Sequence, residues 1–206
     1  MARYIGPKCR NCRRFGMKLC SKPATKCAWE RRKSPPGVQS TRRRRTTEYG
    51  IQLREKQKAR AIYGILERQF RNYYMKASKL DGVTGDLLLQ FLESRLDNVV
   101  YRIGFADSRE QARQFVNHGH ILVNGSRVDI PSFQVSESDT IEWKKNPKDT
   151  PFIQEITKGI PKRPVPDWLS LSSNSWLMSS PPLCRKHTRF NGVGAASSKS
   201  LDSNIH

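Results

Sequence analysis

The chain has 206 residues, with 38 Lys and Arg against 18 Asp and Glu, which gives a formal net charge of +20 and an isoelectric point near 10.2. This length suits one or two modest domains and excludes a large enzyme scaffold. The excess positive charge favours a polyanionic partner, usually nucleic acid, and no stretch reaches the roughly 18 apolar residues of a membrane span.

The positive charge is concentrated in the first part of the chain. Residues 1–60 hold 19 Lys or Arg and 3 Asp or Glu, so they carry +16 of the total of +20. Aromatic and apolar residues lie between these charges, which distinguishes the segment from a plain charged tail. Its beginning lacks the apolar run of a secretory signal, so we expect the chain to stay in the reducing compartment where it is made.

The chain begins with a segment that has no regular period. Gly, Pro and the arginine run at 42–45 interrupt residues 1–45, which we predict to be an irregular basic arm. A mostly helical domain is predicted over 46–93. Its helices are expected from Thr46 or Thr47 to about Ala61, over 66–79, and onward from Thr84.

Residues 94–148 combine helical and alternating patterns and are predicted to form a small module. One helix is expected over 95–103. Another is expected from Arg109 to Gly119, because Ser108 and Gln111 form a capping box. The period then alternates, which predicts strands at 120–123, 127–130 and 140–143, the first two joined by a tight turn at Asn124-Gly125.

The predicted fold class is therefore α+β. The mostly helical domain, completed by part of 150–171, is joined to a small helix-plus-β-hairpin module. From 172 to 206 Ser, Asn, Gly and Lys dominate without a period, so this tail is predicted to be disordered.

Four of the five cysteines lie close together near the start of the chain: Cys9, Cys12, Cys20 and Cys27. The segment around them is too short and too charged to bury a core, and a structural zinc ion with four thiolate ligands would stabilise it. Zinc is the first choice, an iron–sulfur cluster accepts the same four ligands, and reduced cysteines without a metal are the remaining alternative. Cys184 and His187 form a lone C-x-x-H, which we attribute to chance.

The helix expected from Arg109 separates polar from apolar residues. Arg109 and Arg113 follow at a four-residue step, whereas Phe115 and Val116 are free to face a core. The polar residues of the following turn and hairpin extend this basic stripe. Together they are expected to line one RNA-facing surface, although a merely solvated face is the alternative.

Three segments of the module resemble a known family: SRLDNVVYR at 94–102, SREQAR at 108–113 and HGHILVNG at 118–125. They are similar to the RNA-binding module of small-subunit ribosomal protein four, which some pseudouridine synthases, tyrosyl-tRNA synthetases and a heat-shock RNA-binding protein share. Outside the module the same ribosomal protein is resembled by MARYIGP at 1–7, LREKQK at 53–58, IYG at 62–64 and ERQFRN at 67–72. The resemblance covers about residues 1–171, in order.

The resemblance implies a structural constituent of the small ribosomal subunit, in the cytoplasm or in an organelle, and not an enzyme. Such a protein binds small-subunit ribosomal RNA at a multi-helix junction, nucleates the subunit body and contributes to decoding accuracy beside small-subunit proteins five and twelve. Some members repress their own messenger RNA. No membrane and no small-molecule substrate is implied, and cysteine-bearing members hold zinc or an iron–sulfur cluster in the amino-terminal arm.

The residues predicted to contact RNA come from the arm, the helical domain and the module. They are Arg42, Arg43, Arg44, Arg45, Arg54, Lys56, Lys58, Arg68, Arg71, Arg95, Arg102, Ser108, Arg109, Gln111, Arg113, His118, His120, Asn124 and Arg127. Lys and Arg on phosphates would supply affinity, and the folded shape of the RNA would select the site. For the five residues between 54 and 71, pairing with Glu55 and Glu67 along the helices is the alternative.

Two other functions fit parts of the pattern. An RNA-modifying enzyme would need a catalytic domain, yet the candidate acids all fall within the module, at Asp97, Asp107, Asp129 and Asp139, and the sequence has no phosphate-binding glycine loop. A free-standing RNA chaperone or messenger repressor would use the same surface and stays open. After Leu171 the usual ending of the family is missing, which favours a shifted reading frame near 172 or a divergent lineage.

Overall fold

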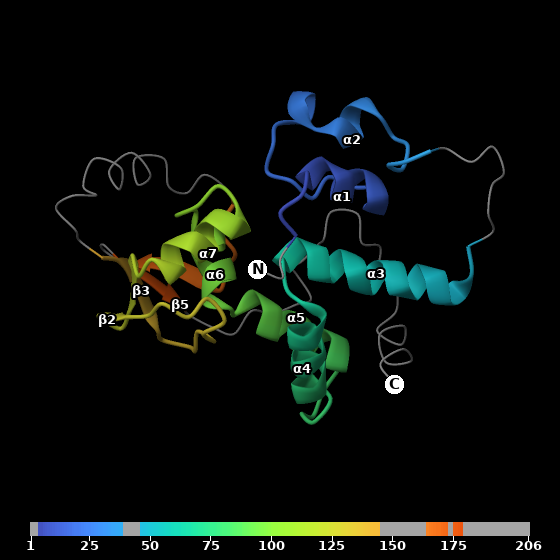
Figure 1. Cartoon of the computed structure of the whole chain (residues 1–206). Coiled ribbons are helices and arrows are strands. Elements are labelled where there is room, and N and C mark those ends of the chain that lie inside the picture. Colours follow the sequence, from blue (N-terminus) through green and yellow to red (C-terminus); the bar gives the residue numbers. More distant parts are fainter. Residues whose placement is uncertain (1–3, 39–45, 145–163, 173–174, 179–206) are drawn as a thin grey trace. The chain divides into compact units, whose positions relative to one another are not determined.

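Two compact units make up the described part of the chain (Figure 1). The computed structural model describes residues 4–38, 46–144, 164–172 and 175–178, and the units divide between Lys79 and Leu80. The boundary expected from the sequence lies after residue 93. The last helix of the predicted helical domain, α5 (Thr84–Glu93), therefore belongs to the second unit.

The described residues of the first unit form helices joined by loops. α3 (Glu48–Tyr63) begins at Thr47, whose hydroxyl accepts a hydrogen bond of 3.2 Å from the backbone N–H of Gly50, and it ends at Gly64 in the left-handed conformation. α4 (Glu67–Ala77) follows directly. Both helices confirm the sequence prediction. No helix in the described ranges has the length and apolar character needed to cross a bilayer.

The described part of the amino-terminal arm contains helices, so the prediction that the arm is irregular was wrong. It contains α1 (Lys8–Phe15), the 3-10 helix η1 (Ala24–Lys26) and the single-turn helix α2 (Ala28–Arg31). α1 packs against α2 and α3, and Arg54 of α3 donates a hydrogen bond of 3.0 Å to the backbone carbonyl of Arg14. Cys9, Cys12 and Phe15 recur at three-residue steps, a helical period that is hidden when cysteines are counted only as ligands.

The second unit combines helices with a five-stranded antiparallel sheet, which confirms the predicted α+β class. α6 (Leu96–Ile103) and α7 (Arg109–Asn117) follow α5, and the strands are β1 (Ile121–Val123), β2 (Ser126–Arg127), β3 (Thr140–Trp143), β4 (Leu169–Ser172) and β5 (Ser175–Met178). The strand order is β2-β1-β3-β5-β4. β2 is shorter than the strand predicted at 127–130, because only Ser126 and Arg127 pair with β1.

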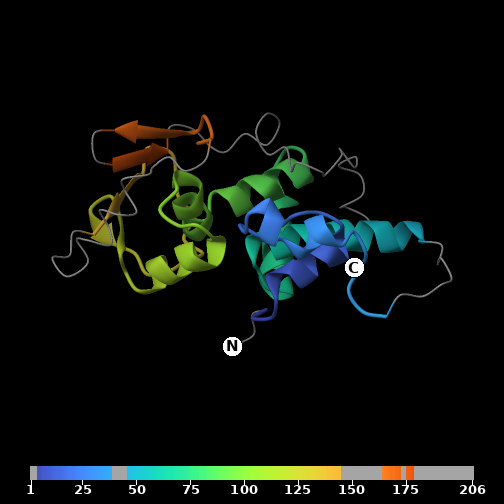
Figure 2. The same cartoon turned by 90° about the horizontal axis from the view of Figure 1, so that it is seen from above.

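The last two strands correct the prediction that the chain is disordered from residue 172. β5 pairs with both β3 and β4, so this hairpin extends the sheet at the edge of β3 (Figure 2, orange arrows). Trp168 and Leu169 lie in the core of the second unit, which differs from the expectation that this segment completes the helical domain. The edge of β3 has backbone groups that need hydrogen-bond partners, and the composition of the tail does not reveal that such an edge lies beside it. Residues 179–206 of the predicted tail lie outside the described residues.

An apolar core joins the helices and the sheet of the second unit. Leu96 and Ile103 of α6, Val116 of α7, Ile121 of β1 and Ile141 of β3 are all fully buried within it. Burying a side chain of this size stabilises the folded state by roughly 1.5–3 kcal/mol relative to leaving it exposed. This packing orients the hairpin of β1 and β2 relative to α7.

Two buried carboxylates lie where α5, α6 and α7 meet. Oδ2 of Asp97 accepts hydrogen bonds from Nη2 of Arg95 at 2.8 Å and from Nη2 of Arg113 at 2.7 Å. The two oxygens of Glu93 accept hydrogen bonds from the guanidinium of Arg102 at 2.6 and 2.9 Å. The side chains of Asp97 and Glu93 are only 3% and 2% exposed, so both carboxylates depend on these partners in place of water.

Replacing Asp97 by alanine should destabilise the second unit, because Arg95 and Arg113 would stay buried without their carboxylate. Removing one partner of a buried ion pair costs about 3–5 kcal/mol, and the free energy of unfolding in urea should fall by about that amount. Asp129→Ala is the matched control at an exposed position and should change it by less than about 0.5 kcal/mol. An Asp97→Ala protein as stable as its parent would contradict this account of the network.

Candidate nucleic-acid interface and cysteine cluster

The hairpin of β1 and β2 is held in one register by its turn. Leu122 lies opposite Arg127 and Val123 opposite Ser126, which leaves a two-residue turn with φ values of 51° at Asn124 and 75° at Gly125. The Asn124 amide donates a hydrogen bond of 2.8 Å to Asp139. Its oxygen accepts hydrogen bonds from the backbone N–H and the hydroxyl of Thr140. Asn124 was predicted to contact RNA, and in this structure its side chain anchors the turn.

The cap of α7 also uses two of the predicted contact residues. The Ser108 hydroxyl accepts a hydrogen bond of 3.2 Å from the backbone N–H of Gln111. The Gln111 side chain accepts one of 2.9 Å from the backbone N–H of Asp107, one residue before the N-cap position where a capping box would bond. The predicted helix start is confirmed, and both polar side chains are engaged locally.

One arginine and two histidines lie together at the end of α7 and on the hairpin. His118 and Arg127 are exposed and His120 is half-buried. The His120 ring stacks on the Trp143 ring with centroids 6.0 Å apart and planes 10° apart, and it contacts the His118 ring at 5.9 Å. Within the described ranges Arg127 forms no ion pair with a carboxylate. We call His118, His120 and Arg127 the hairpin cluster.

Arg95 and Arg113 do not lie on the surface predicted for them. They are only 1% and 7% exposed, and both guanidinium groups bind Asp97. The sequence prediction treated their charges as available to RNA because it had no means of placing Asp97 between them. Their observed role is to join α6 and α7 through one buried carboxylate.

Arg102 and Arg109 are half-buried and also engaged within the second unit. Arg102 binds both oxygens of Glu93, and the Asn98 amide donates a further hydrogen bond of 2.7 Å to that carboxylate. Arg109 donates one of 2.8 Å to the side-chain oxygen of Asn98, and its guanidinium lies 4.5 Å from the centre of the Tyr101 ring. Both side chains retain partial exposure, and the charge of Arg102 is matched by Glu93.

The cations of the first unit fall into two groups. Lys58 binds both oxygens of Glu55, three residues earlier in α3, at 2.6 Å, as the pairing alternative expects. Lys56 of α3 lies 2.9 Å from Glu67 of α4, so this ion pair joins two helices. Arg54 is exposed and bonded to the carbonyl of Arg14. Arg68 and Arg71 are exposed on α4 and have no acidic partner in the described part of the chain. The predicted contacts from Arg42 to Arg45 lie outside the described residues.

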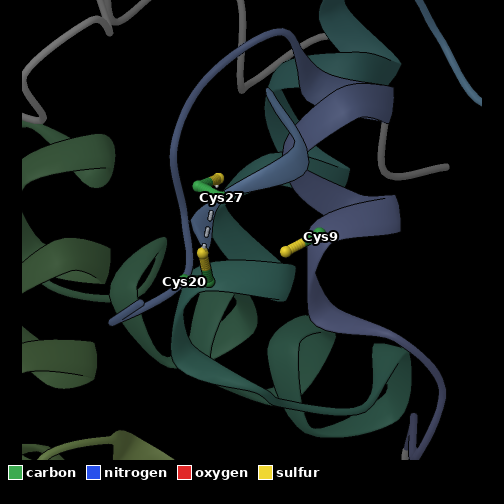
Figure 3. Close-up of side chains that lie close together, drawn as sticks. All are labelled: Cys9, Cys20 and Cys27. Atoms are coloured by element: carbon green, nitrogen blue, oxygen red, sulfur yellow. Dashed lines mark hydrogen bonds between the residues drawn. The ribbon is translucent and has the colours of Figure 1, made fainter. Parts of the chain in front are cut away.

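The structure brings three of the four predicted cysteines together, Cys9, Cys20 and Cys27 (Figure 3). The sulfur atoms of Cys9, Cys20 and Cys27 all lie within 4.8 Å of one another, and those of Cys20 and Cys27 are 3.6 Å apart. The side chain of Cys12 is fully buried, its sulfur accepts a hydrogen bond of 3.3 Å from the backbone N–H of Leu19, and it does not belong to this group of three. Helix α1 carries Cys9 and Cys12 on one face, and the loops around η1 supply the other two.

The thiols differ in how easily they ionise. Burial raises the pKa of Cys20 to about 12, and hydrogen bonds with the neighbouring thiols act in the same direction. Burial opposes ionisation of Cys27 as well. The backbone N–H groups of Trp29 and Glu30 and the thiol of Cys20 outweigh it, so the pKa of Cys27 is lowered. The Cys27 thiol therefore ionises more readily than a free cysteine, and the neighbouring Cys20 thiol ionises less readily.

The arrangement fits a tetrahedral metal ion. Zinc–sulfur bonds of about 2.3 Å place the sulfur atoms of such a site roughly 3.8 Å apart, close to the 3.6 Å between Cys20 and Cys27. Cys9 lies within 4.8 Å of both, which gives three converging thiols, and Cys12, the fourth predicted ligand, lies outside this group. The donor set is thus suited to zinc and equally to an iron–sulfur cluster.

Comparison with known proteins assigns the chain to a family. Residues 3–93 match the family described as the ribosomal protein S4/S9 N-terminal domain, and residues 94–141 match the S4 domain. The chain is 52% identical over 179 residues to the small ribosomal subunit protein uS4 of Heliobacterium modesticaldum, which covers 85% of this chain and 86% of that protein. The chain belongs to the uS4 family.

Two further relatives are similar over most of their length. The uS4 protein of Trichlorobacter lovleyi is 49% identical over 180 residues, 85% of this chain and 86% of that protein. The uS4 protein of Dictyoglomus turgidum is 55% identical over 175 residues, 83% of this chain and 84% of that protein. The family resemblance predicted from the sequence motifs is confirmed.

In this family member, α5 supports the S4 domain although it precedes it in the chain. The matched S4 domain starts at Ser94, whereas the second unit of the structure starts at Leu80. α5 contacts α6 and contributes Glu93, which holds Arg102 and Asn98. The sequence prediction missed Glu93 and Asn98 as positioning residues. The only available signal was a carboxylate directly before a conspicuous run of basic and polar residues.

The stabilities of Arg113→Ala and Arg127→Ala should differ, because Arg113 has a structural role and Arg127 lies on the surface. Arg113→Ala removes a buried partner of Asp97 and should lower the free energy of unfolding by about 3–5 kcal/mol. Arg127→Ala alters an exposed side chain and should change it by less than about 0.5 kcal/mol. Urea denaturation followed by circular dichroism measures both, and equal losses would show that the two arginines have been sorted wrongly.

Proposed function

We propose that this chain is a structural constituent of the small ribosomal subunit that binds small-subunit ribosomal RNA and has no catalytic role. The observation that carries the proposal is the match to uS4 proteins over more than four-fifths of the chain. The net charge of +20 supports it, because a polyanion relieves the self-repulsion of such a chain. The proposed location is the ribosome, in the bacterial cytoplasm or in an organelle.

The proposed phosphate contacts are Arg68 and Arg71 on α4 of the first unit and Arg127, with the neighbouring His118 and His120, of the second. Arg68, Arg71 and Arg127 are exposed and have no acidic partner among the described residues. Arginines bound to Asp97 or Glu93 contribute by holding the platform rigid, since their charge is already compensated. The major groove of A-form RNA is too narrow for side chains to read, so the shape of the folded RNA selects the site and the phosphates supply affinity.

The wider role follows from the family. We propose that the chain binds a multi-helix junction early in assembly, nucleates the body of the subunit, and lies beside small-subunit proteins five and twelve, where it contributes to decoding accuracy. Binding to its own messenger RNA is a secondary role that the same surface supports. Sedimentation of washed small subunits tests the assembly role, since a protein acting only as a free repressor would be absent from them.

We also propose that Cys9, Cys12, Cys20 and Cys27 bind a structural zinc ion. The proposal is supported by the convergence of the sulfur atoms of Cys9, Cys20 and Cys27 and by the short helices in this segment. α1 and α2 are too short to be stable alone, and a bound metal supplies folding free energy to a segment without a large apolar core. The ion would crosslink α1 to the segment from Cys20 to Cys27.

Replacing both Arg68 and Arg71 by alanine should weaken binding to a small-subunit RNA transcript of Heliobacterium modesticaldum. Each phosphate contact contributes about 0.9 to the slope of log affinity against log salt, so the slope should fall by up to about 1.8. Arg60→Ala is the matched control, because Arg60 is already paired with Glu67 at 2.6 Å, and it should leave the slope unchanged. An unaltered slope in the double variant would remove α4 from the interface, and a parent protein that does not prefer this transcript to random RNA would refute the proposed function.

Metal analysis of protein purified without oxygen should find zinc bound to the chain in a one-to-one ratio. Cys20→Ser should lose the metal and the helical signal of the arm, because the site supplies folding free energy to that segment. Cys184→Ser makes the same change at the fifth cysteine, outside the cluster, and should retain both. If the analysis finds iron with visible absorption, the bound group is an iron–sulfur cluster and not zinc. A metal-free protein with a folded arm would refute the site.

A further inference from the structure

Gly119 connects the end of α7 to β1 and is buried, although His118 before it is exposed. The guanidinium of Arg127, from the returning strand β2, covers it. A Cβ atom placed on Gly119 would overlap Nε of Arg127 and lie 2.5 Å from its Cζ and Nη2 atoms. The guanidinium therefore occupies the space that any other residue at position 119 would fill with its side chain.

Backbone conformation alone does not account for this glycine. Gly119 has φ of 70° and Gly125 in the hairpin turn has φ of 75°, so both adopt the left-handed conformation that side chains disfavour. A Cβ on Gly125 would meet no atom within 4 Å, whereas one on Gly119 would meet Arg127. The close approach of the guanidinium is thus a requirement particular to position 119.

The elements around Arg127 leave its charge directed at solvent. Arg127 pairs in register with Leu122 of β1, whose neighbours Ile121 and Val123 are buried, so Arg127 lies on the outer side of the hairpin. Within the described residues it has no carboxylate partner. The residues on either side of Gly119 are His118 and His120, and the His120 ring is held by stacking on Trp143. A guanidinium lying across this backbone offers its donors in a fixed plane, as a phosphate requires.

We propose that Gly119 is a positioning residue for RNA binding. Because it has no side chain, the Arg127 guanidinium can lie against the backbone between His118 and His120, where it forms the binding site for one backbone phosphate. This inference rests on the proposed function and names a contact within it. A methyl group at position 119 displaces the flexible end of Arg127 and leaves the fold of the hairpin in place. The cost then falls on RNA affinity, through the loss of one oriented charge.

The test measures affinity for the small-subunit transcript across a range of salt concentrations with full-length variants. Arg127→Ala should weaken binding roughly tenfold and lower the salt slope by about 0.9, as expected for one charged hydrogen-bonding contact to phosphate. Gly119→Ala should reproduce both effects although it removes no charge. In the double variant, Gly119→Ala should add no further loss, because Arg127 is already absent.

Gly125→Ala is the matched control, since it imposes the same backbone strain without meeting Arg127. Its midpoint of urea unfolding should shift as much as that of Gly119→Ala, while its salt slope stays at the parent value. A Gly119→Ala protein with the parent salt slope, or a double variant whose losses add, would overturn the positioning role. A parent protein without preference for the transcript over random RNA would instead overturn the proposed function, and the slopes measured on random RNA would still report on Gly119.

Discussion

In the second unit, buried carboxylates determine which arginines are available to a polyanion. Asp97 lies between Arg95 and Arg113, and Glu93 holds Arg102, so these charges are matched inside the unit. Removing such carboxylates from water is unfavourable unless their partners are well placed. The pairs therefore join α5, α6 and α7 into a rigid platform, whereas Arg127 of the hairpin stays exposed.

Much of the fold could be predicted because local signals and tertiary structure agree. The Thr47 and Ser108 caps, the glycine ends of helices and the Asn124-Gly125 turn act over a few residues, and each is found where it was expected. The arm and the last hairpin were predicted wrongly for one shared reason. α1 and β5 are short, and each packs against an element distant in the chain, α3 for α1 and the edge of β3 for β5.

The candidate site was predicted at the level of residue type and less well at the level of role. Charge and motif pointed to RNA, and the spacing of the cysteines pointed to a shared site, where the sulfur atoms of three of the four lie within 4.8 Å of one another. Sequence spacing does not show that Arg113 reaches Asp97 across 16 positions, or that Arg127 covers Gly119. Such contacts arise only when the helices and the hairpin pack, so basic residues with identical chemistry divide into structural and exposed sets.

The division of arginines is tested most directly by their reactivity toward an arginine-selective dicarbonyl reagent, followed residue by residue by mass spectrometry with and without the small-subunit transcript. Arg127, Arg68 and Arg71 should react in the free protein and be protected by the RNA, whereas Arg95 and Arg113 should be unreactive in both states because they are 1% and 7% exposed. Rapid modification of Arg95 in the free protein, together with its protection by RNA, would contradict the account.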